Sequence, residues 1–88
     1  MNMEEYNDDD CLTTRQLADK LNKPFKLLKA ILMGQQWVQL IGTGWSEGAK
    51  IRGKGYTKIL PAYNGTKFSW TPLGQEKVRR LYFAVRKK

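Results

Sequence analysis

Residues 13–34, TTRQLADKLNKPFKLLKAILMG, have the pattern of two helices joined by a very short turn. Thr13 and Gln16 have the three-residue spacing of a capping box, in which each side chain bonds the backbone of the other residue. Leu12 and Leu17 flank this box at the positions of a hydrophobic staple. The first helix is therefore expected to begin at Thr13.

The second helix is expected to begin at a proline, Pro24. Pro24 disfavours helical backbone at the residue before it, so the first helix should end near Asn22. Pro24 is itself suited to the first position of a helix, and Gly34 is a natural stop. The apolar residues between them fall on one face: Phe25, Leu28, Ile31 and Leu32. Three lysines step along the other side: Lys23, Lys26 and Lys29. This is the pattern of a helix-turn-helix with a basic second helix.

The pattern then changes from helical to extended. Residues 37–41 are short, aromatic and β-branched, and predict a strand. Residues 42–55 contain five glycines and predict an irregular loop. Within this loop, residues 48–54 match the phosphate-binding pattern G-x-x-x-x-G-K, but Gly55 replaces the magnesium-binding Ser or Thr. No buried strand is expected before this segment and no helix after it, so we reject nucleotide hydrolysis. The hypothesis that remains is a basic loop that touches a DNA phosphate.

A β-hairpin is predicted next. Residues 56–63 and 66–70 are rich in aromatic and β-branched residues and flank the dipeptide Asn64-Gly65. Asn-Gly favours a two-residue type I′ turn, because both positions need a positive φ. Pro61 is expected on an edge of this ribbon, since proline cannot donate to a sheet.

A C-terminal helix completes the chain. Thr71 is expected to cap it and Pro72 to take its first position, while Gly74 should weaken the first turn. Its apolar stripe consists of Val78, Leu81, Tyr82 and Val85. The basic residues near its end suit the negative pole of the helix dipole: Arg79, Arg80, Arg86, Lys87 and Lys88. The predicted fold is a single α+β domain over residues 11–88, a winged helix-turn-helix with a small antiparallel β-ribbon and a C-terminal helix.

Charge is strongly sorted along the chain. Residues 1–10 contain five acids and no base, and predict a flexible acidic tail. Residues 11–88 contain all 16 Lys and Arg but only three acids, so this domain carries +13 although the whole chain carries +8. Polyanions are the usual partners of such a basic domain, and duplex DNA is the first hypothesis. An alternative for the tail is that it folds back and competes with nucleic acid for the basic face.

Enzymatic chemistry has little support in the composition. The chain has no histidine and one cysteine, Cys11, so the commonest general base and a protein-built zinc site are lacking. No catalytic residue, metal or cofactor is expected, and the protein is predicted not to be an enzyme. The lone cysteine favours the reducing cytoplasm. No apolar run is long enough for a membrane span, so no membrane partner is expected.

The predicted DNA contacts come from two elements. Three lysines belong to the second helix and three to the wing: Lys23, Lys26, Lys29, Lys54, Lys58 and Lys67. Further candidate contacts are Gln35, Arg52 and Tyr56. The alternative for these lysines is an ordinary solvated surface. Most of the tryptophans are expected to fill the core, and Trp45 in the loop is the least certain of them.

Four short motifs resemble one family in the family's order. They are LTTRQLA at residues 12–18, GQQWV at 34–38, KGYT at 54–57 and WTPLG at 70–74. Together they are similar to the C-terminal domain of phage antirepressors, the KilAC domain, over about residues 12–83. The resemblance implies a winged helix-turn-helix that binds DNA in a phage or prophage, and hence a location in the cytoplasm of a bacterial host cell. It also implies that the lysine-rich second helix and the 54–57 segment are the nucleic-acid elements.

The predicted function is therefore that of a DNA-binding regulator of transcription or replication in a phage or prophage. Two alternatives remain open. In the first, the chain binds and modulates a host or phage protein, as an antirepressor does. In the second, it binds single-stranded nucleic acid through Trp45 and Tyr56. A DNA-binding domain should be displaced by heparin and respond to salt, whereas a protein-binding module need not. The sequence does not determine the DNA target site, whether a protein partner is bound, or whether the chain forms a homodimer.

Overall fold

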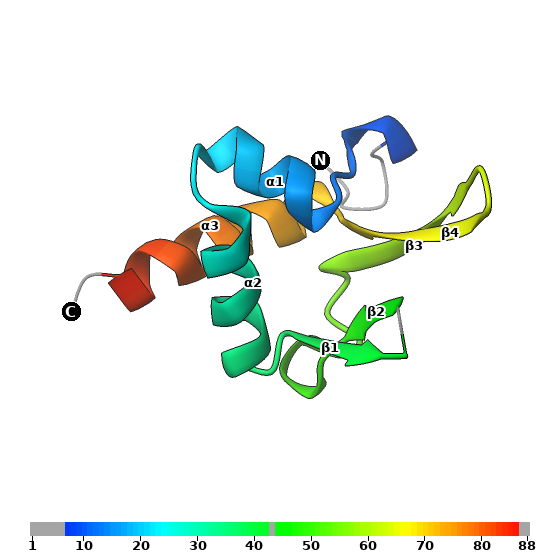
Figure 1. The fold of residues 1–88 in the computed structure, drawn as a ribbon. Coiled ribbons are helices and arrows are strands. Elements are labelled where there is room, and N and C mark those ends of the chain that lie inside the picture. Colours follow the sequence, from blue (N-terminus) through cyan, green and yellow to red (C-terminus); the bar gives the residue numbers. More distant parts are fainter. Residues whose placement is uncertain (1–6, 43, 87–88) are drawn as a thin grey trace.

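The computed structural model describes residues 7–42 and 44–86, which form three α-helices, two β-hairpins and two short 3₁₀ turns. In chain order the elements are η1 (Asp8–Asp10), α1 (Thr14–Leu21), α2 (Phe25–Gly34), β1 (Val38–Ile41), β2 (Gly44–Glu47), η2 (Ala49–Ile51), β3 (Thr57–Ala62), β4 (Gly65–Trp70) and α3 (Pro72–Arg86). The three α-helices gather on one side of the molecule and the hairpins on the other (Figure 1). The predicted α+β class is confirmed; the expected ribbon is present as β3–β4, and a second hairpin, β1–β2, accompanies it.

The start and end of α1 agree with the prediction. The Thr13 hydroxyl accepts a bond from the Gln16 amide at 3.2 Å, and the Gln16 side chain accepts one from the Thr13 amide at 2.9 Å. The helix ends where Asn22 adopts the left-handed conformation, with φ of 57°. Asn22 turns the chain out of the helix, so that only three residues separate the end of α1 from the start of α2.

Both ends of α2 differ slightly from the prediction. Pro24 is the N-cap rather than the first helical residue, because its ψ of 131° is extended. Its carbonyl oxygen nevertheless accepts a bond from the Leu28 amide at 3.1 Å. At the other end Gly34 is still helical, and the left-handed residue that turns the chain is Gln36, with φ of 63°.

Strand β2 was not predicted, because its glycine-rich sequence resembles a loop. It pairs with β1 in antiparallel register, with Leu40 opposite Trp45. Gly48 follows directly and lies against the backbone of residue Gln36, where a Cβ would collide with the carbonyl group. The Gly48 amide also donates to the Trp37 carbonyl at 2.9 Å. This close backbone approach closes the hairpin and explains why position 48 is a glycine.

The β3–β4 hairpin was predicted correctly except for its turn. Ala62 pairs with Gly65, so the turn residues are Tyr63 and Asn64 rather than Asn64 and Gly65. Asn64 does not have the positive φ that a type I′ turn requires, while Gly65 has a φ of 132°. Pro61 lies in β3 opposite Thr66, and in this two-stranded ribbon every strand is an edge.

The hydrophobic core lies between the three helices and the end of β4. Trp70 is completely buried there, and its indole N–H donates to the Thr14 hydroxyl at 3.0 Å. Leu12 pairs with Trp70 through two backbone bonds of 3.1 and 2.7 Å, which brings the segment before α1 against the segment before α3. The other buried apolar residues of this core are Leu17, Ala18, Leu28, Ile31, Leu32, Val38, Ile51, Val78 and Tyr82.

Helix α3 begins as predicted, but the role of one glycine differs. The Thr71 hydroxyl accepts a bond from the Gly74 amide at 3.1 Å and donates one to the Gly55 carbonyl at 2.8 Å. Gly74 was expected only to weaken the helix. Instead a Cβ at this position would collide with the Tyr56 carbonyl oxygen, so glycine lets α3 pack against the loop before β3.

The chain ends fall partly outside the described residues. The predicted acidic tail, residues 1–10, is described only from Asn7, and its last three residues form η1. At the other end Lys87 and Lys88 are not described, and Arg86 is the last residue of α3. None of the described helices is long and apolar enough to cross a lipid bilayer.

Candidate nucleic-acid interface

The three lysines predicted for the second helix do not form one row. Lys23 lies in the linker before α2, and its ammonium is 5.6 Å from the ring centre of Phe83 on α3. Lys26, the second residue of α2, is exposed. The Lys29 ammonium lies 5.8 Å from the ring centre of Trp45 on β2. A step of three residues leaves two side chains only about 60° apart around a helix, so Lys26 and Lys29 are neighbours on α2, whereas Lys23 lies outside the helix and turns toward α3.

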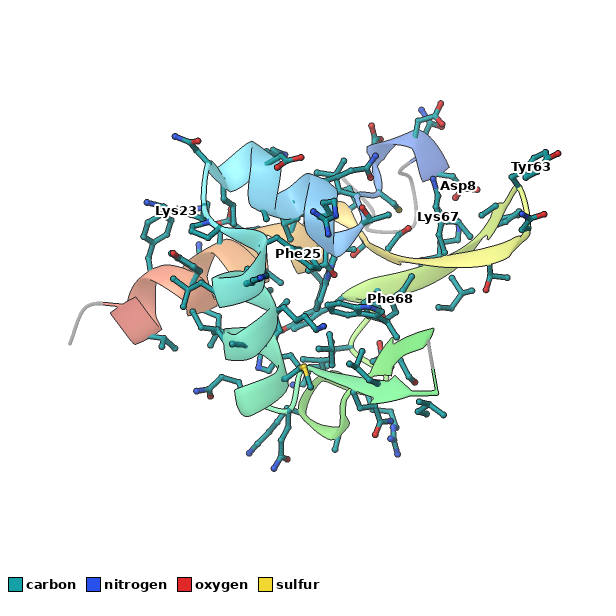
Figure 2. The ribbon with its side chains drawn as sticks, in the orientation of Figure 1. Asp8, Lys23, Phe25, Tyr63, Lys67 and Phe68 are labelled. Atoms are coloured by element: carbon teal, nitrogen blue, oxygen red, sulfur yellow. The ribbon has the colours of Figure 1, made fainter. Side chains whose placement is uncertain are left out.

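Two of the predicted wing lysines share one face of the β3–β4 hairpin. Lys58 lies opposite Ser69, and Leu60 lies opposite Lys67. Because paired residues and residues two apart share a face, Lys58 and Lys67 are on the same side. The Asp8 carboxylate of η1 binds the Lys58 ammonium there at 2.7 Å. Figure 2 shows Asp8 and Lys67 on the hairpin side of the molecule and Lys23 on the helix side.

The glycine-rich loop contains Arg52 and Lys54, both exposed, but does not form a phosphate cradle. The Gly53 amide donates to the Glu47 carboxylate at 3.3 Å, and the Lys54 amide donates to the Ile51 carbonyl at 3.1 Å. Internal acceptors therefore occupy amides that a bound phosphate would need. The two side chains remain available as cations.

The remaining two candidate contacts are differently placed. Gln35 is exposed at the end of α2. The Tyr56 ring packs against Trp37, with ring centres 5.6 Å apart, so it is a packing residue as well as a surface one. Among the tryptophans Trp70 fills the core, whereas Trp37 and Trp45 are only half-buried.

A cluster that the sequence did not predict lies between α2 and the hairpins. The Phe25 ring is 6.2 Å from that of Trp45, which is 6.1 Å from that of Phe68, with tilts of 42° and 32°. The Arg15 guanidinium lies over the Phe25 ring at 4.3 Å, and Lys29 approaches Trp45. These rings come from α2, β2 and β4, so no local pattern reveals the cluster. The one signal in the sequence was Trp45, the least certain of the core tryptophans and a stacking residue in the single-strand alternative.

This cluster borders an open pocket of about 310 Å³, here called the aromatic pocket. Its lining residues are Thr13, Thr14, Arg15, Phe25, Trp45, Lys67 and Phe68. Two of them are cations and none is an acid. Three aromatic rings beside cations, with no carboxylate, form a surface suited to a flat, electron-rich group attached to an anion.

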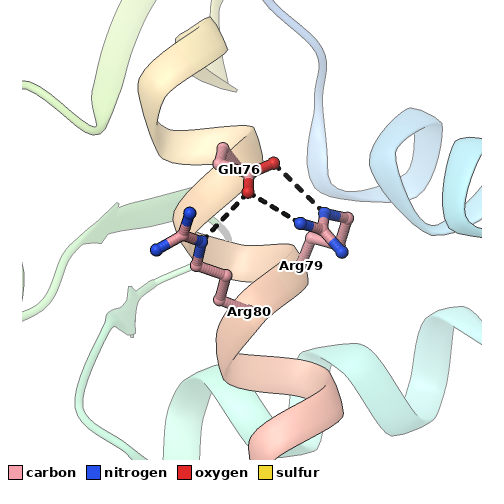
Figure 3. Close-up of polar contacts among 3 residues, drawn as sticks. All are labelled: Glu76, Arg79 and Arg80. Carbon is pink, nitrogen blue, oxygen red and sulfur yellow. Dashed lines mark hydrogen bonds and ion pairs between the residues drawn. The ribbon is translucent and has the colours of Figure 1, made fainter.

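A second hollow, of about 220 Å³, lies between α1 and α3 and has a different charge balance. On its rim the Glu76 carboxylate bonds Arg79 at 2.7 Å and Arg80 at 3.0 Å (Figure 3). Hydrogen bonds from these two guanidinium groups lower the pKa of Glu76 to about 2. The Lys20 ammonium donates to the Gln75 side chain at 3.2 Å. The predicted basic cluster on α3 is therefore partly neutralised.

Reactive groups are few in the described part of the chain. No group of three or more His, Cys, Asp or Glu residues there is arranged to hold a metal ion. Burial raises the pKa of the Cys11 thiol, which keeps it protonated and unreactive at neutral pH.

Comparison with models of known protein families gave no match, and comparisons with characterised proteins and with solved structures gave none either. The geometry of the chain itself is therefore the basis for a functional assignment.

Proposed function

We propose that this chain is a winged helix-turn-helix module that binds duplex DNA, with α2 facing the groove and the β3–β4 hairpin as the wing. The short linker between α1 and α2 supports this assignment. In helix-turn-helix modules the first residues of the second helix contact the DNA, and the first helix crosses the backbone.

Unbalanced positive charge at the beginning of α2 carries the proposal. Lys26 is exposed there and, among the described residues, neither it nor Lys67 forms an ion pair. The Glu47 carboxylate is bonded to the Thr57 hydroxyl at 2.6 Å, and Glu76 is bonded to arginines of α3. Two of the three acids of the folded domain are thus engaged elsewhere, and phosphates are the counter-charges that Lys26 and Lys67 lack.

The wing supplies the second set of contacts in this proposal. Lys58 and Lys67 lie on one face of the β3–β4 hairpin, and Lys54 and Arg52 are exposed in the loop before it. Phosphate contacts of this kind fix the position of a protein on the duplex without reading its sequence. The resemblance to the KilAC domain favours a regulator of transcription or replication in a phage or prophage.

The proposal is tested by fluorescence anisotropy of a labelled blunt duplex of about 20 base pairs, two helical turns. We expect micromolar binding at low salt. If four lysines contact phosphates, the slope of log affinity against log salt is about −3.6. Heparin should displace the duplex. Absence of binding at low salt would contradict the proposal and would favour an acidic protein partner.

A further inference from the structure

The three rings of the aromatic pocket are the strongest feature that duplex binding does not use. A base inside a B-form duplex is stacked on both faces and cannot enter a pocket on a protein surface. The pocket is nevertheless built from three rings and bordered by cations, and it adjoins the helix proposed to face the DNA. It therefore requires an explanation beyond backbone contacts.

We infer that the aromatic pocket binds an unpaired nucleobase, so that the module recognises DNA in which a single-stranded segment adjoins a duplex. The inference rests on the proposed function for the duplex part. The base would stack against the pocket-facing sides of Phe25, Trp45 and Phe68, and its phosphate would lie among Arg15, Lys29 and Lys67.

The geometry of the rings supports a stacking role. Phe25 on α2 and Phe68 on β4 lie between the helix and the hairpin (Figure 2), and each is half-buried. Trp45 lies within 6.2 Å of both rings, and the pairs are tilted rather than parallel. The cluster is therefore not closed by face-to-face stacking between its own members. Single-strand binders commonly place bases on such aromatic platforms.

The charges select an anionic ligand over a neutral aromatic one. The Arg15 guanidinium lies 4.3 Å from the Phe25 ring centre, where a planar cation can also stack on a base. Lys29 lies over Trp45, and Lys67 lines the same pocket. Because the pocket lining includes cations and no acid, its charge suits a nucleotide and an acidic peptide side chain equally. The two ligands differ in shape, since only the nucleotide has a flat ring to place on the aromatic side chains. The aromatic surface is what favours the nucleobase.

The position of the pocket connects it to the duplex contacts. Phe25 is the first residue of α2, and the exposed Lys26 is its neighbour in the chain. Lys67, one of the proposed wing contacts, lines the pocket itself, so a phosphate bound by Lys67 brings the next nucleotide close to the rings. This arrangement suits a strand that leaves a duplex end and places its first unpaired base on the rings.

The test compares two DNA ligands by anisotropy: a blunt duplex and the same duplex with a short single-stranded thymidine tail. We expect the tailed duplex to bind about 5- to 150-fold more tightly, which is the factor that one stacked base provides. Equal affinities for the two ligands would overturn the inference and leave the proposed function intact. Absence of binding to both ligands would overturn the two together.

Variants of the pocket residues test whether the preference for the tailed duplex depends on the aromatic pocket. Trp45→Leu should abolish the preference for the tail, with blunt-duplex affinity unchanged, while Trp45→Phe should keep most of it. Trp45→Leu retaining the full preference would overturn the assignment. Arg15→Gln provides a second variant at an exposed position, should the leucine variant fail to fold, and it should also reduce the preference. Oligo-thymidine should quench the tryptophan fluorescence of the unmodified protein. Fluorescence that does not change on adding oligo-thymidine would contradict the inference.

Discussion

Asp8 and Lys58 form an ion pair of 2.7 Å, although 50 residues of sequence separate them. Through this contact the acidic turn η1 lies on the face of the β3–β4 hairpin that also carries Lys67. The end of the acidic segment thus occupies part of the surface proposed to bind phosphates. This placement favours the alternative in which the segment folds back and competes with DNA.

Neutralising Asp8 should strengthen DNA binding. We expect Asp8→Asn to raise the affinity for a blunt duplex by about 1.5- to 5-fold at low salt, the range that corresponds to an exposed ion pair. Asp9→Asn removes the same charge from the neighbouring exposed residue and should have a smaller effect. Anisotropy titrations measure both. The effect of Asp8→Asn should shrink in a Lys58→Gln background; an undiminished effect would show that the ion pair is not its cause.

Lys26 should contribute one phosphate contact. Lys26→Gln is expected to weaken binding equally for unrelated sequences and to reduce the salt slope by about 0.9. Lys20→Gln is the charge-matched control, because Lys20 bonds Gln75 at the hollow between α1 and α3. Equal losses in the two variants would mean that net charge alone governs binding and that α2 has no special role.

Gly74 should be intolerant of a side chain. Alanine usually stabilises a helix interior by about 1 kcal/mol relative to glycine. Here the added Cβ meets the Tyr56 carbonyl, so we expect Gly74→Ala to lower the free energy of unfolding by about 1–3 kcal/mol, the usual cost of overpacking. Gly34→Ala is the control, since no atom lies within 4 Å of its added Cβ, and it should be neutral or stabilising. Urea denaturation gives both values. A stabilising Gly74→Ala would contradict the close approach.

Glu76 should make thermal stability depend on acid pH. Its pKa falls from the ordinary 4.5 to about 2, so its stabilising effect is fully present above pH 4.5 and is lost as the pH falls toward 2. Glu76→Gln should therefore have a lower Tm than the unmodified protein at neutral pH, and the two should converge near pH 2. Circular dichroism melts across this range measure the difference. A difference that does not change with pH would exclude this carboxylate as its source.

Local sequence signals predicted the elements whose determinants are neighbours in the chain. The capping box at Thr13, the break before Pro24 and the cap at Thr71 each depend on residues within one helical turn. The errors arise where distant segments meet. Gly48 closes the β1–β2 hairpin against Gln36, and Gly74 accommodates Tyr56, and neither relation is visible locally.

The candidate site was less predictable than the fold for the same reason. Lysine spacing suggested a single basic row, but Lys23 and Lys29 turn toward rings on different elements. The aromatic pocket joins Phe25, Trp45 and Phe68, which belong to three elements far apart in sequence. Its existence depends on the β1–β2 hairpin, which was not expected.

The pairing of Leu12 with Trp70 has a consequence for how the protein is made. Thr14, at the start of α1, bonds the Trp70 indole across 56 residues, and Leu12 and Trp70 exchange two backbone bonds. A ribosome must therefore have released residue 70 from its exit tunnel before α1 can complete its packing. Until then the apolar faces of α1 and α2 lack this central tryptophan, so the domain cannot fold stepwise from its N-terminal helices and must wait for β4.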